Sequence, residues 1–408
     1  MTGKRKRKLA MPDTLIIVAS VVLLVAILSW IIPSGTYDYQ EMNINGRIRN
    51  VAIDGTYHTI DKSEVTTTGF LGFFSVLYRG CVEAADVIFM ILCCCGTFGV
   101  VVKTGAFHAG IGTILKKLKG KEILLVPIIM MIFGLGGSVF GMASEFYGFY
   151  PLIVGLGVAL GYDAMFGFAI IAVGEFVGFM GATLNPYSVG IAQTISGVEL
   201  YSGTGYRAIC FVIFMAISII YVMVYGRKIK KNPGASVVFG EKNIHAFDRD
   251  ELNEYSFTLK DGLVLLDVLV VLVVLMLGLI KWGWDFPQLC GLFLLMSMIA
   301  AAICKWSPNK WCSEFIDSAK TAMWGCILTG IAKAITVVMQ DAQIMDTVIY
   351  GLSNVLKNAP HAVSAQVMLV VQTLINFFIP SATGQASATM PIMAQLADII
   401  GVSRQTAV

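Results

Sequence analysis

A seven-residue pattern of small and hydroxyl-bearing residues occurs twice in this chain. Residues 138–144 read Ser-Val-Phe-Gly-Met-Ala-Ser, and residues 381–387 read Ser-Ala-Thr-Gly-Gln-Ala-Ser, so Ser, Gly, Ala and Ser recur in the same register 243 positions later. Both copies lie where a hydrophobic stretch breaks. In a membrane protein, one broken hydrophobic segment in each half is the sequence feature that best indicates a transporter's substrate site.

Several side chains in the two copies could bind a polar solute through hydroxyl or amide groups. Half-helix N-termini at such breaks also present free N–H groups and a positive dipole end, which suits a substrate carboxylate. For any single residue, helix packing is the simpler interpretation, because small residues let membrane helices approach. The repeated cluster as a whole favours binding. The substrate candidates are Ser138, Ser144, Ser381, Thr383, Gln385 and Ser387.

Two glutamates lie in or beside apolar segments, where a carboxylate costs about 3 kcal/mol on insertion scales and indicates function. Glu145 is a candidate to bind a cationic side chain, a proton or Na⁺, and the alternative is a rim residue that faces water. Glu175 is a candidate proton carrier in ion coupling. Its alternative is a structural pair with a buried lysine, for which Lys333 is a candidate.

A second interruption follows the first copy, at the sequence Thr-Leu-Asn-Pro of residues 183–186. A following proline disfavours the α conformation of Asn185, and Pro186 frees a carbonyl one turn back. Unwound carbonyls together with the oxygens of Thr183, Asn185 and Ser188 would form a pocket for a coupling cation, and Asn185 is also a substrate candidate. The alternative is a simple loop at the end of a span.

Membrane helices would have to position these groups. The chain is 57% hydrophobic and 13% charged, whereas soluble domains are about 25% charged. A helix needs about 20 apolar residues to cross the bilayer core. Runs near that length predict an all-α polytopic membrane protein surrounded by lipid. They cover residues 15–32, 87–102, 123–140, 165–182, 209–225, 262–280, 289–304 and 363–379.

Other classes of function find little support in the sequence. The net charge is only +3, and the basic cluster at residues 4–8 precedes a span, where the positive-inside rule explains it without nucleic acid. The nine cysteines and four histidines lack metal-ligand spacing. Nucleotide-binding and hydrolase motifs are missing too. We therefore expect no enzyme and no cofactor beyond a coupling ion, Na⁺ or H⁺.

Basic residues indicate the topology. They predict a cytoplasmic N-terminus and four segments: residues 1–68 as first helix and external loop, 69–226 as a first repeat, 227–260 as a cytoplasmic linker, and 261–408 as an incomplete second repeat. Turn pairs at Asn45-Gly46 and Asp54-Gly55 in the external loop are typical of a small β-hairpin.

The two halves show the same order of elements with opposite charge. Amphipathic helices are expected near residues 105–118 and 341–355. Several lysines accompany the first helix, whereas a single lysine, Lys357, accompanies the second. Equivalent elements would then lie on opposite membrane faces, which predicts inverted repeats. The inversion requires re-entrant helical hairpins, one centred on the glycine run at 133–138 and one around 380–391. Non-helical backbone at that depth must be covered by protein or line a cavity.

Motifs over nearly the whole chain resemble those of one transporter family. They are Phe133-Gly134-Leu135-Gly136-Gly137, Phe140-Gly141-Met142-Ala143, Tyr150-Pro151-Leu152, Ala159-Leu160-Gly161-Tyr162-Asp163, Asn185-Pro186, Gly190-Ile191-Ala192, Asn376-Phe377-Phe378-Ile379-Pro380-Ser381, Gly384-Gln385-Ala386 and Met390-Pro391-Ile392-Met393-Ala394. In these the chain resembles the YfcC-type carriers of the four-carbon-dicarboxylate anaerobic carrier group, within the ion transporter superfamily. The resemblance implies a bacterial inner-membrane secondary transporter with inverted repeats, two re-entrant hairpins, two discontinuous helices, elevator-type alternating access and a homodimer.

The chain departs from that family in three places. Ser144-Glu145 stands where two acids are often found, Glu175 stands where a small residue is expected, and the second discontinuous helix would fall beyond Val408, so we expect a fragment. Family members are usually labelled basic amino acid antiporters. We therefore expect a transporter of small carboxylate-bearing solutes, such as arginine and ornithine. The alternatives are a dicarboxylate carrier and, from another class, an intramembrane hydrolase or a non-transporting scaffold.

Overall fold

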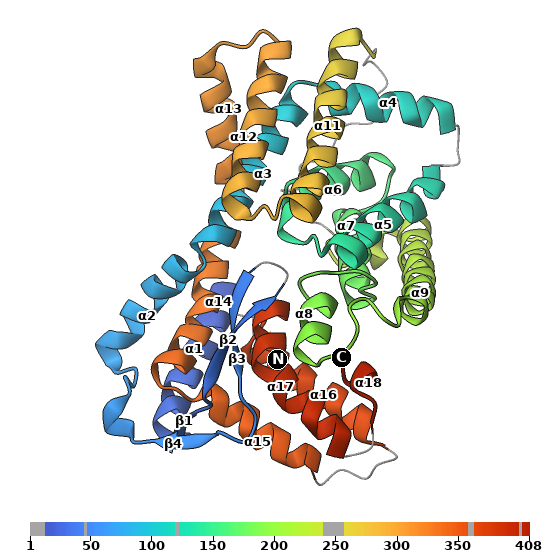
Figure 1. Cartoon of the computed structure of the whole chain (residues 1–408). Helices are drawn as coiled ribbons and strands as arrows, with labels where there is room; N and C mark the ends of the chain where they lie inside the picture. The colour runs from blue at the N-terminus through green and yellow to red at the C-terminus, as the bar shows by residue number, and fades with distance from the viewer. Residues whose placement is uncertain (1–12, 45–46, 119–121, 240–256, 358–362, 400–401) are drawn as a thin grey trace, which may run out of the picture.

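Most of the chain is helical in the computed structural model, which describes residues 13–44, 47–118, 122–239, 257–357, 363–399 and 402–408 (Figure 1). Within these residues, five helices are long and apolar enough to cross a membrane. They are α1 (Thr14–Ile31), α3 (Ala85–Lys103), α9 (Thr204–Lys231), α12 (Phe286–Ile303) and α14 (Met323–Asp341). Large apolar side chains stay exposed along them, as lipid contact requires. The prediction of a polytopic helical protein is confirmed.

Two long, nearly continuous helices pack along each other. Helix α2 (Phe70–Glu83) leads into α3, and α13 (Pro308–Lys320) leads into α14. Helix α2 packs along α14, while α13 packs along α3, so each half of one long helix lies against the opposite half of the other. Glycine permits the close approach: a Cβ atom at Gly80 would lie 2.4 Å from the carbonyl oxygen of Gly330.

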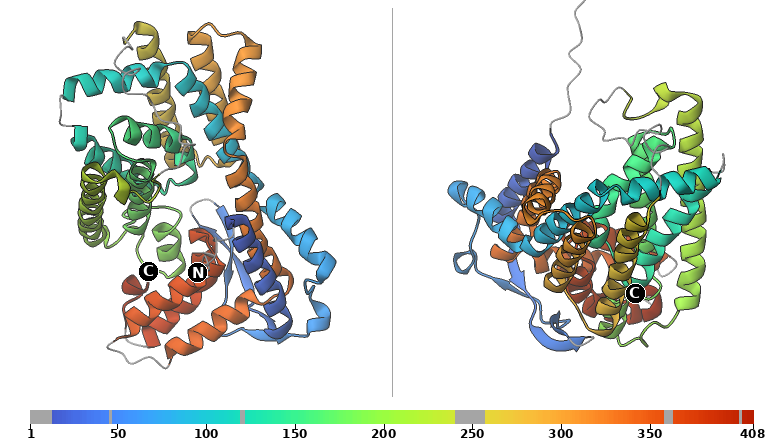
Figure 2. Two further views of the ribbon diagram at one scale, coloured as in Figure 1. Left: turned by 180° about the vertical axis from the view of Figure 1, so that it is seen from behind. Right: turned by 90° about the horizontal axis from the view of Figure 1, so that it is seen from above.

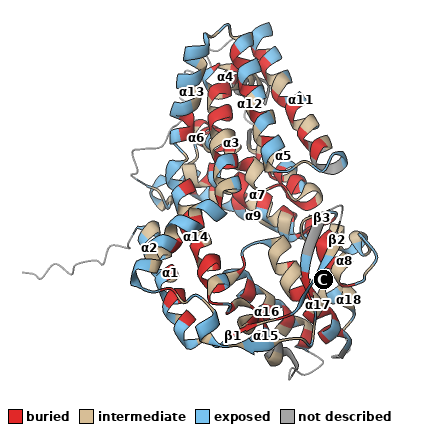
Figure 3. Cartoon of the chain, turned by 60° about the vertical axis from the view of Figure 1, so that its left-hand side comes forward, coloured by how far each residue is buried: buried red, intermediate tan, exposed pale blue. Residues whose placement is uncertain are grey.

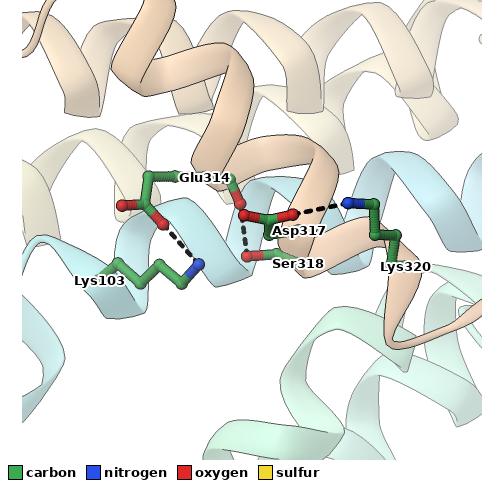
Figure 4. A network of polar contacts seen from close by, with 5 residues as sticks. All are labelled: Lys103, Glu314, Asp317, Ser318 and Lys320. Carbon is green, nitrogen blue, oxygen red and sulfur yellow. Dashed lines mark hydrogen bonds and ion pairs between the residues drawn. The ribbon is translucent and has the colours of Figure 1, made fainter.

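An ion pair joins the two long helices at each end of their contact. Lys103 at the end of α3 contacts Glu314 of α13 (Nζ–Oε2, 2.5 Å), and Arg79 of α2 contacts Asp341 at the end of α14 (Nη1–Oδ2, 2.5 Å). Figure 4 shows the first pair beside a short pair within α13. At one end the residue at the helix terminus is the base, Lys103 of α3. At the other end it is the acid, Asp341 of α14, so the sign of the charge at the helix terminus differs between the two ends.

Two amphipathic helices lie at opposite ends of the molecule. Helix α4 (Ala106–Leu118) crosses one end, and α15 (Met345–Lys357) crosses the other, as Figures 1 and 2 show. Both helices were expected from the sequence. Two of the predicted cytoplasmic lysines, Lys119 and Lys121, lie outside the described residues.

The predicted external segment contains strands within an otherwise mostly helical protein, as its turn pairs indicated. β1 (Ser34–Thr36) pairs antiparallel with β4 (His58–Ile60), and β2 (Tyr39–Ile44) pairs antiparallel with β3 (Arg47–Ala52). The expected β-hairpin is thus confirmed, although its Asn45-Gly46 turn lies outside the described residues. The physical reason is composition: this segment is polar and alternates side chains, which suits strands.

One buried carboxylate fixes this segment to α15. Asp346 accepts hydrogen bonds from the Thr36 hydroxyl (3.2 Å), the Tyr37 amide (3.1 Å) and the Tyr39 hydroxyl (2.8 Å). The strands are thereby held against the turn between α14 and α15.

The buried apolar residues of the described chain form three large clusters and one small one. The first large cluster joins α3, α9, α12 and helices of the first half, the second joins β3 to helices near the C-terminal end, and the third joins α1, α2 and α14. Figure 3 shows the buried residues on the inward faces. The predicted four-segment division stays a prediction, and half of its linker, residues 240–256, is outside the described residues. The other elements are η1 (Lys62–Glu64), η2 (Glu122–Leu124), α5 (Leu125–Leu135), η3 (Gly136–Phe140), η4 (Ser144–Phe149), α6 (Tyr150–Ala159), α7 (Ala164–Met180), α8 (Val189–Ile195), η5 (Pro233–Ala235), α11 (Leu259–Lys281), α16 (Ser364–Phe378), α17 (Ala382–Ile399) and α18 (Arg404–Ala407).

Candidate functional site

The first copy of the repeated pattern forms an irregular break between α5 and α6. Helix α5 continues into the π-helical turn η3, and the chain then reverses at Gly141, whose φ is +67°. A Cβ atom at Gly141 would lie 2.5 Å from Oδ1 of Asn185, so only glycine fits. The break falls later than the predicted centre at 133–138. Glycines in that run instead allow close packing, since a Cβ at Gly137 would lie 2.7 Å from the Glu175 carbonyl oxygen of α7.

A second break separates α7 from α8, as predicted, and leaves residues 181–188 without helical structure. Asn185 is fully buried and organises this break. Its Oδ1 accepts hydrogen bonds from the amides of Tyr187 (2.9 Å) and Ser188 (3.2 Å), and its Nδ2 donates to the Gly137 carbonyl (3.3 Å). The side chain therefore joins the α7–α8 break to the η3 turn.

Ser138 and Thr183 make the second connection between the two breaks. The Thr183 amide donates to the Ser138 carbonyl (2.9 Å), and the Ser138 hydroxyl donates to the Gly181 carbonyl (2.9 Å). The two hydroxyl oxygens lie 3.1 Å apart. We call Ser138, Thr183 and Asn185 the break cluster. Residues predicted from two separate motifs are thus brought together in the protein interior.

The second copy adopts a different local structure from the first. The chain is non-helical only at residues 379–381 between α16 and α17, and Ser381 accepts a hydrogen bond from the Gly384 amide (3.2 Å) as the helix begins. Thr383 donates to the Tyr187 carbonyl (3.0 Å) and so reaches the α7–α8 break. Ser387 bonds within its own helix, to the Thr383 carbonyl. Thr383 therefore contacts the same broken segment as the break cluster, whereas the Ser387 hydroxyl bonds within α17.

Gln385 fastens the two arms of the second hairpin. Its Nε2 donates to Oε1 of Gln372 on α16 (2.6 Å), and its Oε1 accepts from Nδ2 of Asn376 (2.9 Å). Gln372 also donates to the Thr389 hydroxyl (3.1 Å). Gln372 and Asn376 were not among the candidate residues predicted from the sequence, although each is a polar residue inside an apolar run, the same signal that indicates Glu175.

The two glutamates lie on neighbouring elements of the first hairpin and α7. Oε2 of Glu145 accepts from the Ala143 amide (2.9 Å), and Oε2 of Glu175 accepts from the Tyr150 hydroxyl (3.0 Å). Glu175 is 1% exposed, and its Oε1 is buried without a hydrogen-bond partner in the described part of the chain. The suggested pair with Lys333 is wrong, because Tyr150 on the adjacent α6 takes that place.

The other candidate residues are less constrained. Ser144 begins η4 and is partly buried. The hydroxyl oxygen of Ser188 is buried and has no hydrogen-bond partner among the described residues. No group of three or more His, Cys, Asp or Glu side chains in the described ranges is arranged to hold a metal ion. Binding of substrate or ion at any of these positions stays a prediction.

A basic residue that the sequence analysis did not single out also reaches the break. Arg207, in the first turn of α9, donates from Nη2 to the Ser202 carbonyl (2.8 Å) and, at 3.5 Å, to the Thr183 carbonyl. It precedes the apolar run at 209–225 by two positions, so its place beside a span was the available signal.

With this geometry established, comparisons with known proteins decide the family. The family model "C4-dicarboxylate anaerobic carrier" (DcuC) matches residues 11–408. The chain belongs to this family. The present carrier is 32% identical to the Escherichia coli (strain K12) protein named "Putative basic amino acid antiporter YfcC", with 100% of this chain and 87% of that protein covered. It is also 28% identical, with the same coverage, to a Haemophilus influenzae protein named only as uncharacterized.

Two solved transporter structures align with lower similarity. They are Alcanivorax borkumensis YdaH, at 13% identity and a TM-score of 0.43, and Neisseria gonorrhoeae MtrF, at 15% identity and a TM-score of 0.45. Each alignment covers 97% of this chain, and covers 85% and 83% of those chains respectively. These scores are too low to assign further properties to the present carrier. Family membership and the apolar helices together identify a multi-pass membrane transporter with a small-molecule substrate.

Proposed function

We propose that this carrier is a secondary active transporter that moves small carboxylate-bearing solutes, and basic amino acids such as arginine and ornithine in particular. Exchange, or coupling to Na⁺ or H⁺, would drive it. The observation that carries the proposal is the break cluster: Ser138, Thr183 and Asn185 meet in the interior, and Thr383 of the second copy bonds to the same broken segment. The name of the E. coli relative supports the choice of substrate.

One partly buried and one fully buried carboxylate favour a cationic solute. Glu145 and Glu175 lie near the first hairpin, and one oxygen of Glu175 lacks a partner among the described residues. Such a carboxylate is expensive in a membrane unless it is protonated or paired. We assign Glu145 to the cationic side chain of the solute, and Glu175, with Thr183, Asn185 and Ser188, to the coupling ion. Substrate contacts would come from the hydroxyl and amide candidates Ser138, Ser144, Asn185, Ser381, Thr383, Gln385 and Ser387.

The proposal includes two inverted repeats that work by an elevator-type motion. The reciprocal packing of α2 with α14 and of α3 with α13 supports it, as does the placement of α4 and α15 at opposite ends (Figure 1). Close glycine contacts between α5 and α7 would let them move as one block. We further propose a homodimer in the bacterial inner membrane with its N-terminus in the cytoplasm.

Transport of labelled solutes into proteoliposomes tests the function. We expect counterflow of arginine and ornithine, and uptake of succinate would favour the alternative dicarboxylate carrier that the family description suggests. Glu145→Gln should weaken a cationic solute far more than a dianionic one. Glu199→Gln is the matched control, because this exposed glutamate lies outside the site. The absence of flux for all three solutes would overturn the proposed function.

Accessibility of single cysteines tests the inversion separately. In a cysteine-free background, labels at Lys116 of α4 and Gly351 of α15 should react from opposite sides of the membrane. Reaction of both positions from one side would reject inverted repeats while leaving solute transport intact.

A further inference from the structure

Arg207 occupies an unusual electrostatic position. It lies in the first turn of the candidate span α9, and its guanidinium reaches the α7–α8 break through the Thr183 carbonyl. Two other arginines of the described chain, Arg79 and Arg404, are each paired with an aspartate. The described ion pairs include no acidic partner for Arg207, whose polar contacts are the carbonyls of Thr183 and Ser202.

The guanidinium keeps unused hydrogen-bonding capacity. Nε of Arg207 is buried and has no hydrogen-bond partner among the described residues. Both carbonyl contacts come from Nη2, and the contact to Thr183 is long at 3.5 Å. An arginine side chain has five N–H donors in a planar fork, and that fork matches a carboxylate. Arg207 as a whole is partly buried, and a cation at a candidate span whose described contacts include no counter-ion indicates a functional position.

The groups next to the fork carry no charge. Residue 203 is a glycine with a φ of +71°, and a Cβ atom there would lie 3.5 Å from Nη1 of Arg207. Gly203 therefore presents no side chain toward the guanidinium, and the atom nearest to such a Cβ would be Nε2 of Gln405, at 3.0 Å. The groups that do approach are neutral, and they include the Thr204 hydroxyl, which bonds to the Thr183 carbonyl (3.4 Å).

We propose that Arg207 is the specificity-determining residue that binds the carboxylate of the transported solute. The inference rests on the proposed function only in requiring that a solute is carried, since an amino acid and a dicarboxylate share this group. The incoming carboxylate takes the place of the long contact to Thr183. Binding is thereby linked to the broken segment that also contacts Ser138 and the second hairpin through Tyr187.

A pair of ligands isolates the carboxylate from the rest of the solute. Arginine and agmatine differ only in that agmatine lacks the carboxylate. In competition with labelled arginine in proteoliposomes, the unsubstituted carrier should prefer arginine over agmatine. Arg207→Gln keeps a donor for the Ser202 carbonyl but removes the charged fork, so arginine should bind about 10- to 100-fold more weakly while agmatine is unchanged. Arg207→Lys keeps a positive charge, so its affinity for arginine should lie between that of the unsubstituted carrier and that of Arg207→Gln.

A control and a stability measurement separate binding from structure. Arg227→Gln changes an exposed arginine near the other end of α9 and should alter neither ligand. Equal losses for arginine and agmatine in Arg207→Gln, with a lowered melting temperature, would identify a structural clamp and overturn the inference. An unchanged preference would overturn it as well. If the unsubstituted carrier binds succinate instead of arginine, a loss of succinate binding in Arg207→Gln supports the inference and rejects only the amino acid substrate. If the carrier binds none of these solutes, the proposed function and this inference fall together.

Discussion

Gly141→Ala is the substitution that most directly tests the geometry of the candidate site. Gly141 has a φ of +67°, and the new methyl group would lie 2.5 Å from Oδ1 and 2.9 Å from Cγ of Asn185. The amide of Asn185 cannot retreat without losing its hydrogen bonds to Gly137, Tyr187 and Ser188. The substitution should therefore separate the first hairpin from the α7–α8 break.

The expected size follows from two separable contributions. A left-handed conformation costs a non-glycine residue about 1–2 kcal/mol. Displacing the Asn185 amide removes three hydrogen bonds of about 1 kcal/mol each. The free energy of unfolding should fall by about 4–5 kcal/mol in Gly141→Ala. Gly161→Ala provides the matched control, because Gly161 has a φ of +79° with no atom within 4 Å of the new Cβ, and it should cost only the first contribution.

Denaturant unfolding in detergent measures both variants, since a changed midpoint at constant slope reports stability. The double variant Gly141→Ala/Asn185→Ala should cost less than the sum of its parts, because the clash needs both side chains. Transport should be lost in Gly141→Ala and retained in Gly161→Ala. Equal destabilisation by the two single alanine substitutions would refute the placement of Asn185 against the first hairpin.

Three further predictions concern the frame around the site. Gly80→Ala should lower the free energy of unfolding by about 1–3 kcal/mol, because its Cβ would meet the α14 backbone. Gly72→Ala on the same helix should leave the free energy of unfolding unchanged, because only a methyl group lies near its Cβ, at 3.7 Å. Equal effects of the two substitutions would reject the close helix contact. Lys103→Glu should cost at most about 1 kcal/mol in the same assay, and adding Glu314→Lys should restore stability; no recovery would show that the two side chains do not interact. Asp346→Ala leaves three donors without their acceptor and should cost about 2–3 kcal/mol, seen as faster proteolysis within residues 33–68; unchanged proteolysis would contradict its anchoring role.

Element positions were predictable from the sequence because apolar length is a strong signal. The run at 15–32 became α1 (Thr14–Ile31), and the run at 87–102 became α3 (Ala85–Lys103). The break at 183–186 was also predictable, because a proline acts on its own backbone and on the residue before it. Such signals are local, so they do not depend on knowing what packs nearby.

Side-chain partners were not predictable, because they depend on which helices meet. Glu175 lies 25 residues from its partner Tyr150, whereas the suggested Lys333 was chosen by its place in the other half. Arg207 was overlooked for the same reason: nothing in its local sequence indicates that residues 183 and 202 fold back to present carbonyl oxygens to it. A cation at the edge of an apolar run is usually interfacial, and only the tertiary structure distinguishes this one.

The two copies of the repeated pattern illustrate the limit most clearly, because the same residue types form different structures. Before the first copy, a glycine run lets α7 approach until its end bonds to Ser138, and the chain must then reverse at Gly141 beside Asn185. Before the second copy stands Pro380, after which Ser381 accepts from the Gly384 amide and starts a regular helix. Gly384 consequently lies within a regular α-helix, whereas Gly141 adopts a left-handed conformation. The pattern therefore identifies where each half breaks, while the residues on either side decide whether the break is bonded to the α7–α8 segment by many groups or reaches it through Thr383.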